Sequence, residues 1–143
     1  MANFSGNDVT FQLGLESTYG TPATPDVQLE FLSESLHQTN NNVESEALVG
    51  AVTTPYFNII GTKVEGDVSY EVHPDKIGEL LYAALGVEGD ATEIITDAYS
   101  HAFTPVKGGT SLPSITVVVD KKADEFTYAG LKIDTLTLSL IHI

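Results

Sequence analysis

The ten residues KVEGDVSYEV, from Lys63 to Val72, indicate the fold class most clearly. Apolar and polar side chains alternate along this stretch, as in a β-strand with one face toward a core and the other toward solvent. The apolar face holds Val64, Val68, Tyr70 and Val72. The opposite face holds three carboxylates: Glu65, Asp67 and Glu71. The stretch therefore predicts an antiparallel strand with one acidic face.

The hydrophobic period changes directly after this strand. Apolar residues recur there at the three- and four-residue spacing of an amphipathic helix, at Ile77, Leu80, Leu81, Ala84 and Leu85. Pro74 suits a first helical position because its missing N–H needs no partner there. Gly86 can adopt the left-handed conformation that ends a helix. We therefore expect one helix from about Pro74 to Leu85.

The rest of the chain has mostly the period of two, interrupted by turn residues. The stretches predicted as strands are 9–15, 27–36, 99–104, 114–120, 125–128 and 131–140. Residues 17–26 are predicted to be a loop or extended arm, and residues 86–98 mostly a Gly/Asp-rich linker. Residues 39–54 remain ambiguous, since Asn40–Asn42 favours a turn and Glu44–Leu48 fits a helical turn or a long loop. The predicted fold is mainly β, an antiparallel β-sandwich or barrel with one flanking helix.

Charge and composition exclude several classes of protein. The 143 residues include 20 Asp and Glu against 6 lysines and no arginine, for a formal net charge of −14. A protein that grips nucleic acid or an anionic membrane surface needs cations, so neither partner is expected. The absence of cysteine excludes disulfides and thiolate chemistry. No stretch is apolar enough to span a bilayer.

Recognisable catalytic and metal-binding motifs are absent from the sequence. We expect no enzyme activity, no cofactor and no metal. The spacing of His73 and Asp75 offers two ligands at most, and the beginning of the helix explains it better. Two features remain open. The acidic face of Glu65, Asp67 and Glu71 is either an ordinary solvated face or an anionic wall. Tyr19, in the arm Thr18-Tyr19-Gly20-Thr21-Pro22, either anchors a loop on its own domain or contacts a neighbouring subunit.

A series of short motifs resembles the tail tube proteins of long-tailed, non-contractile bacteriophages. In chain order these are ESTYGTP (16–22), LEFLSESL (29–36), residues 61–71, the helical stretch 74–86, HAFTP (101–105), LPSIT (112–116) and FTYAG (126–130). The resemblance covers about residues 10 to 137. It departs from the family after Gly50, where a basic residue is expected and Ala51–Thr54 has none.

The resemblance implies a tail-tube-like fold and a structural role in the virion, with assembly in the host bacterial cytoplasm. Such subunits form hexameric rings whose inner sheets line a channel, and the stacked rings carry DNA from capsid to cell. Arms and long loops bridge neighbouring subunits and rings. The implied partners are further copies of the chain and the tape measure, tail tip and tail terminator proteins. DNA passes without being bound, and an acidic wall of Glu65, Asp67 and Glu71 suits this passage because it repels phosphates.

The end of the sequence suggests a fragment. Residues 138–143, LSLIHI, resemble the peptide encoded by a common sequencing-library adapter, although they also suit the end of a strand. We expect residues 1–137 to be the N-terminal part of a longer tail-tube-like protein and residues 138–143 to be non-native read-through. The alternatives are a tube protein of a contractile injection or type VI-like secretion system, and an acidic β-sandwich binding module. Such a module would favour exposed tryptophan, and the chain has none.

Overall fold

A computed structural model of the chain describes residues 8–44 and 57–139. Within these ranges it has twelve strands and one helix, and all strand pairings are antiparallel. The prediction of a mainly β, antiparallel fold with one helix is confirmed. The chain divides into two compact units, one formed by residues 1–30 and 71–143 and the other by residues 31–70. No helix in the described ranges is long and apolar enough to cross a membrane.

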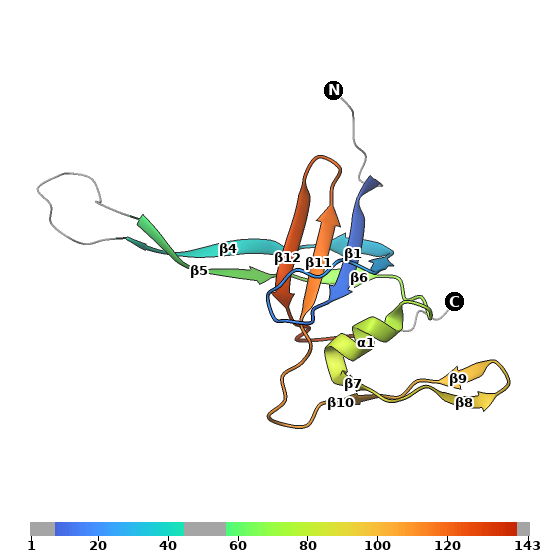
Figure 1. The fold of residues 1–143 in the computed structure, drawn as a ribbon. Coiled ribbons are helices and arrows are strands. Elements are labelled where there is room, and N and C mark those ends of the chain that lie inside the picture. Colours follow the sequence, from blue (N-terminus) through green and yellow to red (C-terminus); the bar gives the residue numbers. More distant parts are fainter. Residues whose placement is uncertain (1–7, 45–56, 140–143) are drawn as a thin grey trace, which may run out of the picture. The chain divides into compact units, whose positions relative to one another are not determined.

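A four-stranded sheet forms the centre of the first unit (Figure 1). Its strands are β1 (Thr10–Leu15), β2 (Val27–Leu29), β11 (Ile115–Asp120) and β12 (Glu125–Leu131), in the order β12-β11-β1-β2. β1 pairs with β11 along its whole length, from Thr10 opposite Asp120 to Leu15 opposite Ile115. The buried apolar side chains are Phe11, Leu13, Leu29, Leu80, Ala83, Ile115, Val117, Val118 and Val119. Most of this core therefore comes from two adjacent strands.

The last strand of the sheet differs from its prediction at its C-terminal end. The expected pairing of residues 125–128 with β11 is confirmed, and the turn or bulge expected at Ala129–Gly130 is a bulge inside β12. Gly130 has a φ of 76°, which a residue without a side chain adopts most easily. The predicted strand 131–140 is wrong, because the ladder ends at Leu131 opposite Ile115. Alternation alone does not make a strand, and no strand within residues 8–44 and 57–139 pairs with the chain after Leu131.

The single helix is shorter than its prediction. α1 runs from Ile77 to Leu85, so Pro74 lies in a preceding turn and not at the first helical position. In that turn the N–H groups of Lys76 and Ile77 both donate to the carbonyl of His73, at 3.0 and 3.1 Å. The predicted stop is confirmed, since Gly86 is left-handed with a φ of 88°.

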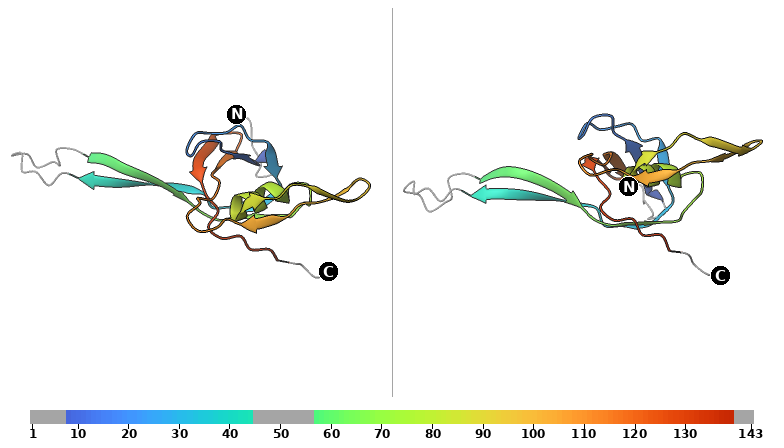
Figure 2. Two further views of the ribbon diagram at one scale, coloured as in Figure 1. Left: turned by 60° about the horizontal axis from the view of Figure 1, so that its bottom comes forward. Right: turned by 90° about the horizontal axis from the view of Figure 1, so that it is seen from below.

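Two short ribbons follow the helix in the first unit. β7 (Gly86–Glu88) pairs with β10 (Phe103–Pro105), and β8 (Thr92–Ile95) pairs with β9 (Ala98–Ser100). The β8–β9 hairpin extends beyond the β7–β10 pair (Figure 2). The predictions of a linker over 86–98 and of one strand over 99–104 are therefore wrong in detail. Gly89 and Asp90 lie between β7 and β8, and His101 and Ala102 lie between β9 and β10. These breaks divide the ribbon into two strand pairs.

The second unit is a ribbon of two successive strand pairs. β3 (Phe31–Glu34) pairs with β6 (Val68–Tyr70), and β4 (His37–Glu44) pairs with β5 (Phe57–Glu65). The single strand predicted over 63–72 is wrong because it breaks at Gly66. Gly66 has a φ of 154°, and a Cβ there would lie 2.5 Å from the carbonyl oxygen of Ser35. The chain therefore needs glycine where the two pairs meet.

Asparagine gave a misleading signal in this unit. Asn40–Asn42 was predicted as a turn, but it lies inside β4, and a register shift occurs between Asn41 and Asn42. The possible helical turn at Glu44–Leu48 falls, apart from Glu44, outside the described residues. Glu44 itself ends β4. Pairing with β5 satisfies the backbone of the asparagines, so tertiary context overrides their low strand preference.

Candidate assembly surfaces

The ribbon of β4 and β5 is exposed along most of its length. All eight residues of β4 are exposed. Large apolar side chains on the two strands are exposed as well, namely Val43, Ile59 and Ile60, and Ile60 retains 69% of its accessible surface. A two-stranded hairpin is marginally stable by itself in water, and exposed apolar patches mark interaction sites. This ribbon is therefore a candidate assembly surface.

A register shift places the most exposed isoleucine of this ribbon. Asn42 pairs with Ile59 and Asn41 pairs with Gly61, so Ile60 is the extra residue of a β-bulge. Bulges bend a strand locally and redirect the side chain of the extra residue. The bulge therefore presents an apolar side chain outside the regular alternation of β5.

The β8–β9 hairpin of the first unit repeats this arrangement on a smaller scale. Ile94, Ile95 and Tyr99 are exposed, with Ile95 at 69%. Glu93 pairs with Tyr99 and Ile95 with Ala98, which leaves Ile94 as the extra residue. The hairpin is a second candidate surface, and sequence analysis missed it because it treated most of this region as a linker.

The carboxylate of Glu16 anchors the loop that follows β1 through hydrogen bonds. It accepts hydrogen bonds from the N–H of Gly20 at 2.8 Å, the N–H of Gly130 at 2.7 Å and the hydroxyl of Thr116 at 2.7 Å. Burial alone would raise the pKa of Glu16. The hydrogen bonds from Gly130, Ser114, Thr116 and Gly20 outweigh it and lower the pKa below its usual value. The charged carboxylate thus joins the loop to β11 and β12.

The predicted inter-subunit arm, Thr18 to Pro22, lies in this anchored loop, and all five of its residues are exposed. The N–H of Thr21 donates to the carbonyl of Thr18 at 3.0 Å, which makes a turn. The Tyr19 ring is 70% exposed, and the Lys132 ammonium lies 5.3 Å from its centroid. The arm is thus held against its own unit while Tyr19 faces outward, so the two interpretations of Tyr19 are compatible.

The three residues of the predicted acidic wall occupy different positions. Glu65 ends β5 and forms an ion pair with Lys63, which lowers the pKa of Glu65 by hydrogen bonding and by its charge. Asp67 lies in the break after Gly66. Its N–H donates a hydrogen bond to the hydroxyl of Ser35, and its carbonyl accepts one from the N–H of Ser35. Glu71 belongs to the first unit, whereas Glu65 and Asp67 belong to the second.

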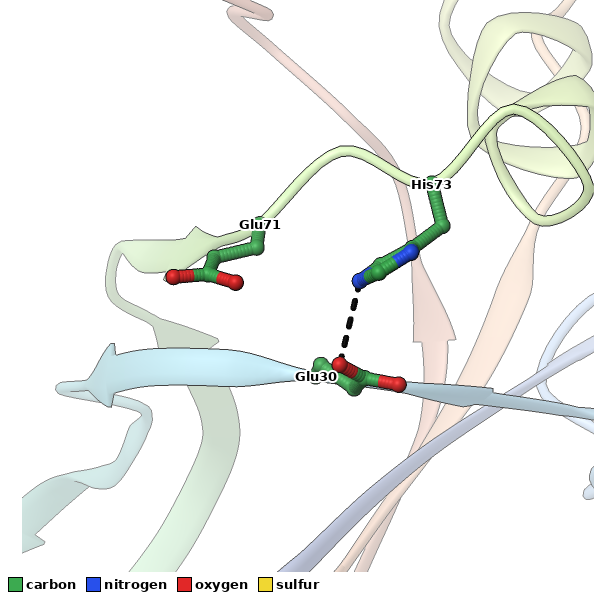
Figure 3. Close-up of side chains that lie close together, drawn as sticks. All are labelled: Glu30, Glu71 and His73. Carbon is green, nitrogen blue, oxygen red and sulfur yellow. Dashed lines mark ion pairs between the residues drawn. The ribbon is translucent and has the colours of Figure 1, made fainter.

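His73 is close to two carboxylates of its own unit, Glu30 and Glu71 (Figure 3). His73 Nε2 lies 3.0 Å from Glu30 Oε2, and the Glu71 N–H donates to the Glu30 carbonyl at 2.9 Å. Lys76 Nζ is 3.5 Å from the other Glu30 oxygen, Oε1. Asp75, which the sequence places nearest to His73, lies in the turn before the helix. The separation of 43 positions between Glu30 and His73 hid this cluster from sequence analysis.

A cavity beside the N-terminal end of α1 contains a further carboxylate. Its walls are Pro74, Asp75, Ile77, Gly78, Glu79, Glu88, His101 and Phe103. Burial raises the pKa of Glu79, and the negative charges of Asp26 and Glu88 raise it further. Glu79 Oε2 is shielded from solvent and has no hydrogen-bond partner in the described part of the chain.

The fold and its surfaces define a β-rich subunit with one well-buried sheet and two exposed apolar ribbons. The chain matches the phage tail tube protein family over residues 6–140, and it belongs to that family. It is therefore a structural component of a phage tail tube and part of the virion. A comparison with curated proteins found no match. Membership in a structural family favours a role without catalysis.

Proposed function

We propose that copies of this chain form hexameric rings that stack into the tube through which phage DNA is ejected. The observation that supports this most strongly is the β4–β5 ribbon, in which every residue of β4 and the side chains of Ile59 and Ile60 are exposed. A ribbon of this kind becomes stable when another surface covers its apolar side chains. In a tube built from one kind of subunit, that surface belongs to a second copy.

The arm from Thr18 to Pro22 is the second proposed contact between copies. Glu16 holds its backbone, so presenting the exposed Tyr19 ring to a neighbour costs little conformational entropy. Aromatic side chains are enriched at interfaces because they bury a large area with few rotatable bonds. A Tyr19→Ser variant should therefore assemble at a higher protein concentration than the wild type. Assembly at an unchanged concentration would remove Tyr19 from the interface.

Assembly is tested with a triple variant of the ribbon, Val43→Thr, Ile59→Thr and Ile60→Thr. Threonine keeps the β-branched shape and strand preference but removes apolar surface. We expect wild-type protein to form rings or tubes in negative-stain electron micrographs at high concentration, and the triple variant to remain small. Val87→Thr, at an exposed position outside the ribbon, is the control and should assemble normally.

Two outcomes of this experiment contradict the proposal. Wild-type protein that stays monomeric at every concentration argues against self-assembly of this chain. Tubes formed equally well by the triple variant argue that the β4–β5 ribbon is not an interface, even if the chain assembles through another surface.

We also propose that the channel wall is anionic, with Glu65, Asp67 and Glu71 as its candidate residues. The formal net charge of −14 supports this, because a negative wall repels phosphates within about 8 Å at physiological salt and lets a duplex pass. Lysine at all three positions in an assembling tube should slow ejection and make its rate depend on salt. The double variant Glu65→Lys with Asp67→Lys keeps Glu71. It therefore distinguishes the contribution of the second unit, which holds Glu65 and Asp67, from that of the first unit, which holds Glu71. Unchanged ejection in both variants would exclude this wall.

The partners that we propose follow from the same role. They are the tape measure protein within the tube and the tail tip and tail terminator proteins at its ends, with assembly in the host cytoplasm. Pull-down of these tail proteins by assembled tubes, but not by the triple ribbon variant, would support the proposal. Equal capture by tubes and by the unassembled variant would argue against binding that depends on the ring.

A further inference from the structure

The cluster of Glu30, Glu71 and His73 has the donor set of a transition-metal site. Each residue offers one ligand atom, and these atoms all lie within 4.8 Å of one another. Around a tetrahedral zinc ion, ligand atoms at about 2.1 Å from the metal are separated by about 3.4 Å. His73 Nε2 and Glu30 Oε2 are already 3.0 Å apart. Glu71 is exposed, so its side chain has room to rotate toward the other two ligands.

The ring nitrogen of His73 provides an independent reason to expect a ligand. Nε2 is shielded from solvent, and no hydrogen bond of regular geometry satisfies it in the described part of the chain. The Glu30 oxygen at 3.0 Å is close enough for an ion pair, but its direction does not suit a hydrogen bond. A shielded polar atom without a hydrogen bond is costly. A metal ion bound through the ring-nitrogen lone pair would remove this cost.

We propose that Glu30, Glu71 and His73 bind a divalent cation of the zinc type. One imidazole nitrogen and two carboxylate oxygens suit zinc, whereas magnesium prefers oxygen ligands alone. Three protein ligands leave the fourth position for water or for a group from another molecule. The strongly negative chain attracts cations to its surface, and the metal offsets the charge of both carboxylates.

The position of the cluster suggests what the metal does. Glu30 is the last residue of the first unit before the chain enters the segment 31–70, and Glu71 is the first residue after it. Only one backbone hydrogen bond, from the Glu71 N–H to the Glu30 carbonyl, joins these two residues directly. A shared ion adds a second connection between the two ends of the inserted segment. It also ties them to the turn that begins α1.

Lys76 makes the proposal distinguishable from a simple ion-pair network. Its ammonium lies 3.5 Å from Glu30 Oε1, and it competes with a metal for the charge of Glu30. If the cluster serves as a network of ion pairs, Lys76→Gln weakens it. If the cluster is a metal site, Lys76→Gln removes the competing cation and zinc binds at least as tightly as before.

The test is calorimetric titration of the purified full chain with zinc chloride after treatment with a chelator. We expect one equivalent of zinc to bind, Lys76→Gln to bind it equally or more tightly, and Glu71→Gln and His73→Ala each to weaken binding by about 10- to 100-fold. The matched control is His101→Ala. His101 Nδ1 lies 3.2 Å from Glu88 Oε1, and no third ligand joins this pair among the residues that the structure describes, so the loss of His101 should leave zinc affinity unchanged.

A second measurement keeps the test decisive if His73→Ala does not fold. Zinc should raise the thermal unfolding temperature of the wild type, but not that of Glu71→Gln, whose substituted side chain is exposed and nearly isosteric. Magnesium chloride should raise neither. The proposal is overturned if the wild type does not bind zinc, if Glu71→Gln binds it as tightly as the wild type, or if His101→Ala loses it equally.

Discussion

β11 and β4 show two ways in which this chain uses a strand. Five of the six residues of β11 are buried, and the strand lies between β1 and β12. All eight residues of β4 are exposed, and among the described strands β4 pairs with β5 alone. The first strand is stabilised within the subunit, whereas the side chains of the second are left exposed. The contrast separates the part of the chain that forms a core from the part that we propose for assembly.

The largest expected effect comes from Leu13→Ala in the buried sheet. Leu13 is 1% exposed and lies opposite Val117 on β11, so truncation leaves a cavity. We expect the free energy of unfolding to fall by about 3 kcal/mol. Urea denaturation measures this loss. A loss below that of Ile60→Ala in the exposed ribbon would contradict the contrast between the two strands.

The second effect is the loss of the Glu16 charge. Glu16→Gln removes the charge and replaces one of the two acceptor oxygens with an NH2 donor, so the three hydrogen bonds to Glu16 cannot all persist, and we expect a destabilisation of about 2 kcal/mol at pH 7. Because folding lowers the pKa of Glu16 below 4.5, its contribution is complete above that pH and is lost as the pH falls through the folded-state value. Wild type and variant should therefore converge in acid.

A matched change in the ribbon sharpens this comparison. The pKa of Glu65 is also lowered, chiefly by its hydrogen bond to Lys63, but its carboxylate is exposed to solvent. Glu65→Gln should change stability far less than Glu16→Gln at pH 7. Equal losses in denaturation profiles would mean that burial does not distinguish the two carboxylates.

The third effect has the opposite sign. Burial and the charges of Asp26 and Glu88 raise the pKa of Glu79 above 4.5, so the folded state binds its proton more tightly than the unfolded state does. The charged side chain therefore lowers stability above the folded-state pKa, and the penalty disappears as the pH falls toward 4.5. Glu79→Gln should stabilise the protein by less than about 1 kcal/mol at pH 7, because solvent screens a carboxylate that is only partly buried. A destabilised variant in thermal unfolding at pH 7 would contradict the unfavourable burial of this charge.

The smallest effect is expected from Ile60→Thr measured on unassembled protein. A side chain that is 69% exposed contributes little within the subunit, so stability should change by no more than about 0.5 kcal/mol. Urea denaturation of dilute, unassembled protein measures the change. A fall of more than about 1.5 kcal/mol in the free energy of unfolding would show that Ile60 packs within its own subunit.

The regular strands of the first unit could be predicted because their patterns are local. β1 alternates between apolar and other residues, and β11 is rich in β-branched residues with Pro113 before its start. The helix was recognised from its spacing, although Pro74 marked the preceding turn and not the first helical residue. Strands that depend on a partner were predicted poorly, as with Asn40–Asn42 inside β4 and the absent strand after Leu131.

The candidate sites followed the same division. The acidic residues Glu65, Asp67 and Glu71 were visible because they alternate along one stretch, but the break at Gly66 depends on the close approach of Ser35. Glu16 was part of a recognised motif, yet its role was hidden because its partners Thr116 and Gly130 lie 100 and 114 positions away. Residue spacing along the chain carries no information about such contacts.

The sequence by itself determined the class of fold, the single helix, the strongly negative charge and the resemblance to tail tube proteins. These follow from composition, periodicity and short motifs, which act over a few residues. Only the tertiary structure decided which carboxylates accept hydrogen bonds from distant residues, which apolar side chains stay exposed, and that Glu30 lies beside His73. Those outcomes depend on strand pairing and burial between distant segments, where the free energy of each side chain is set by neighbours that local sequence does not specify.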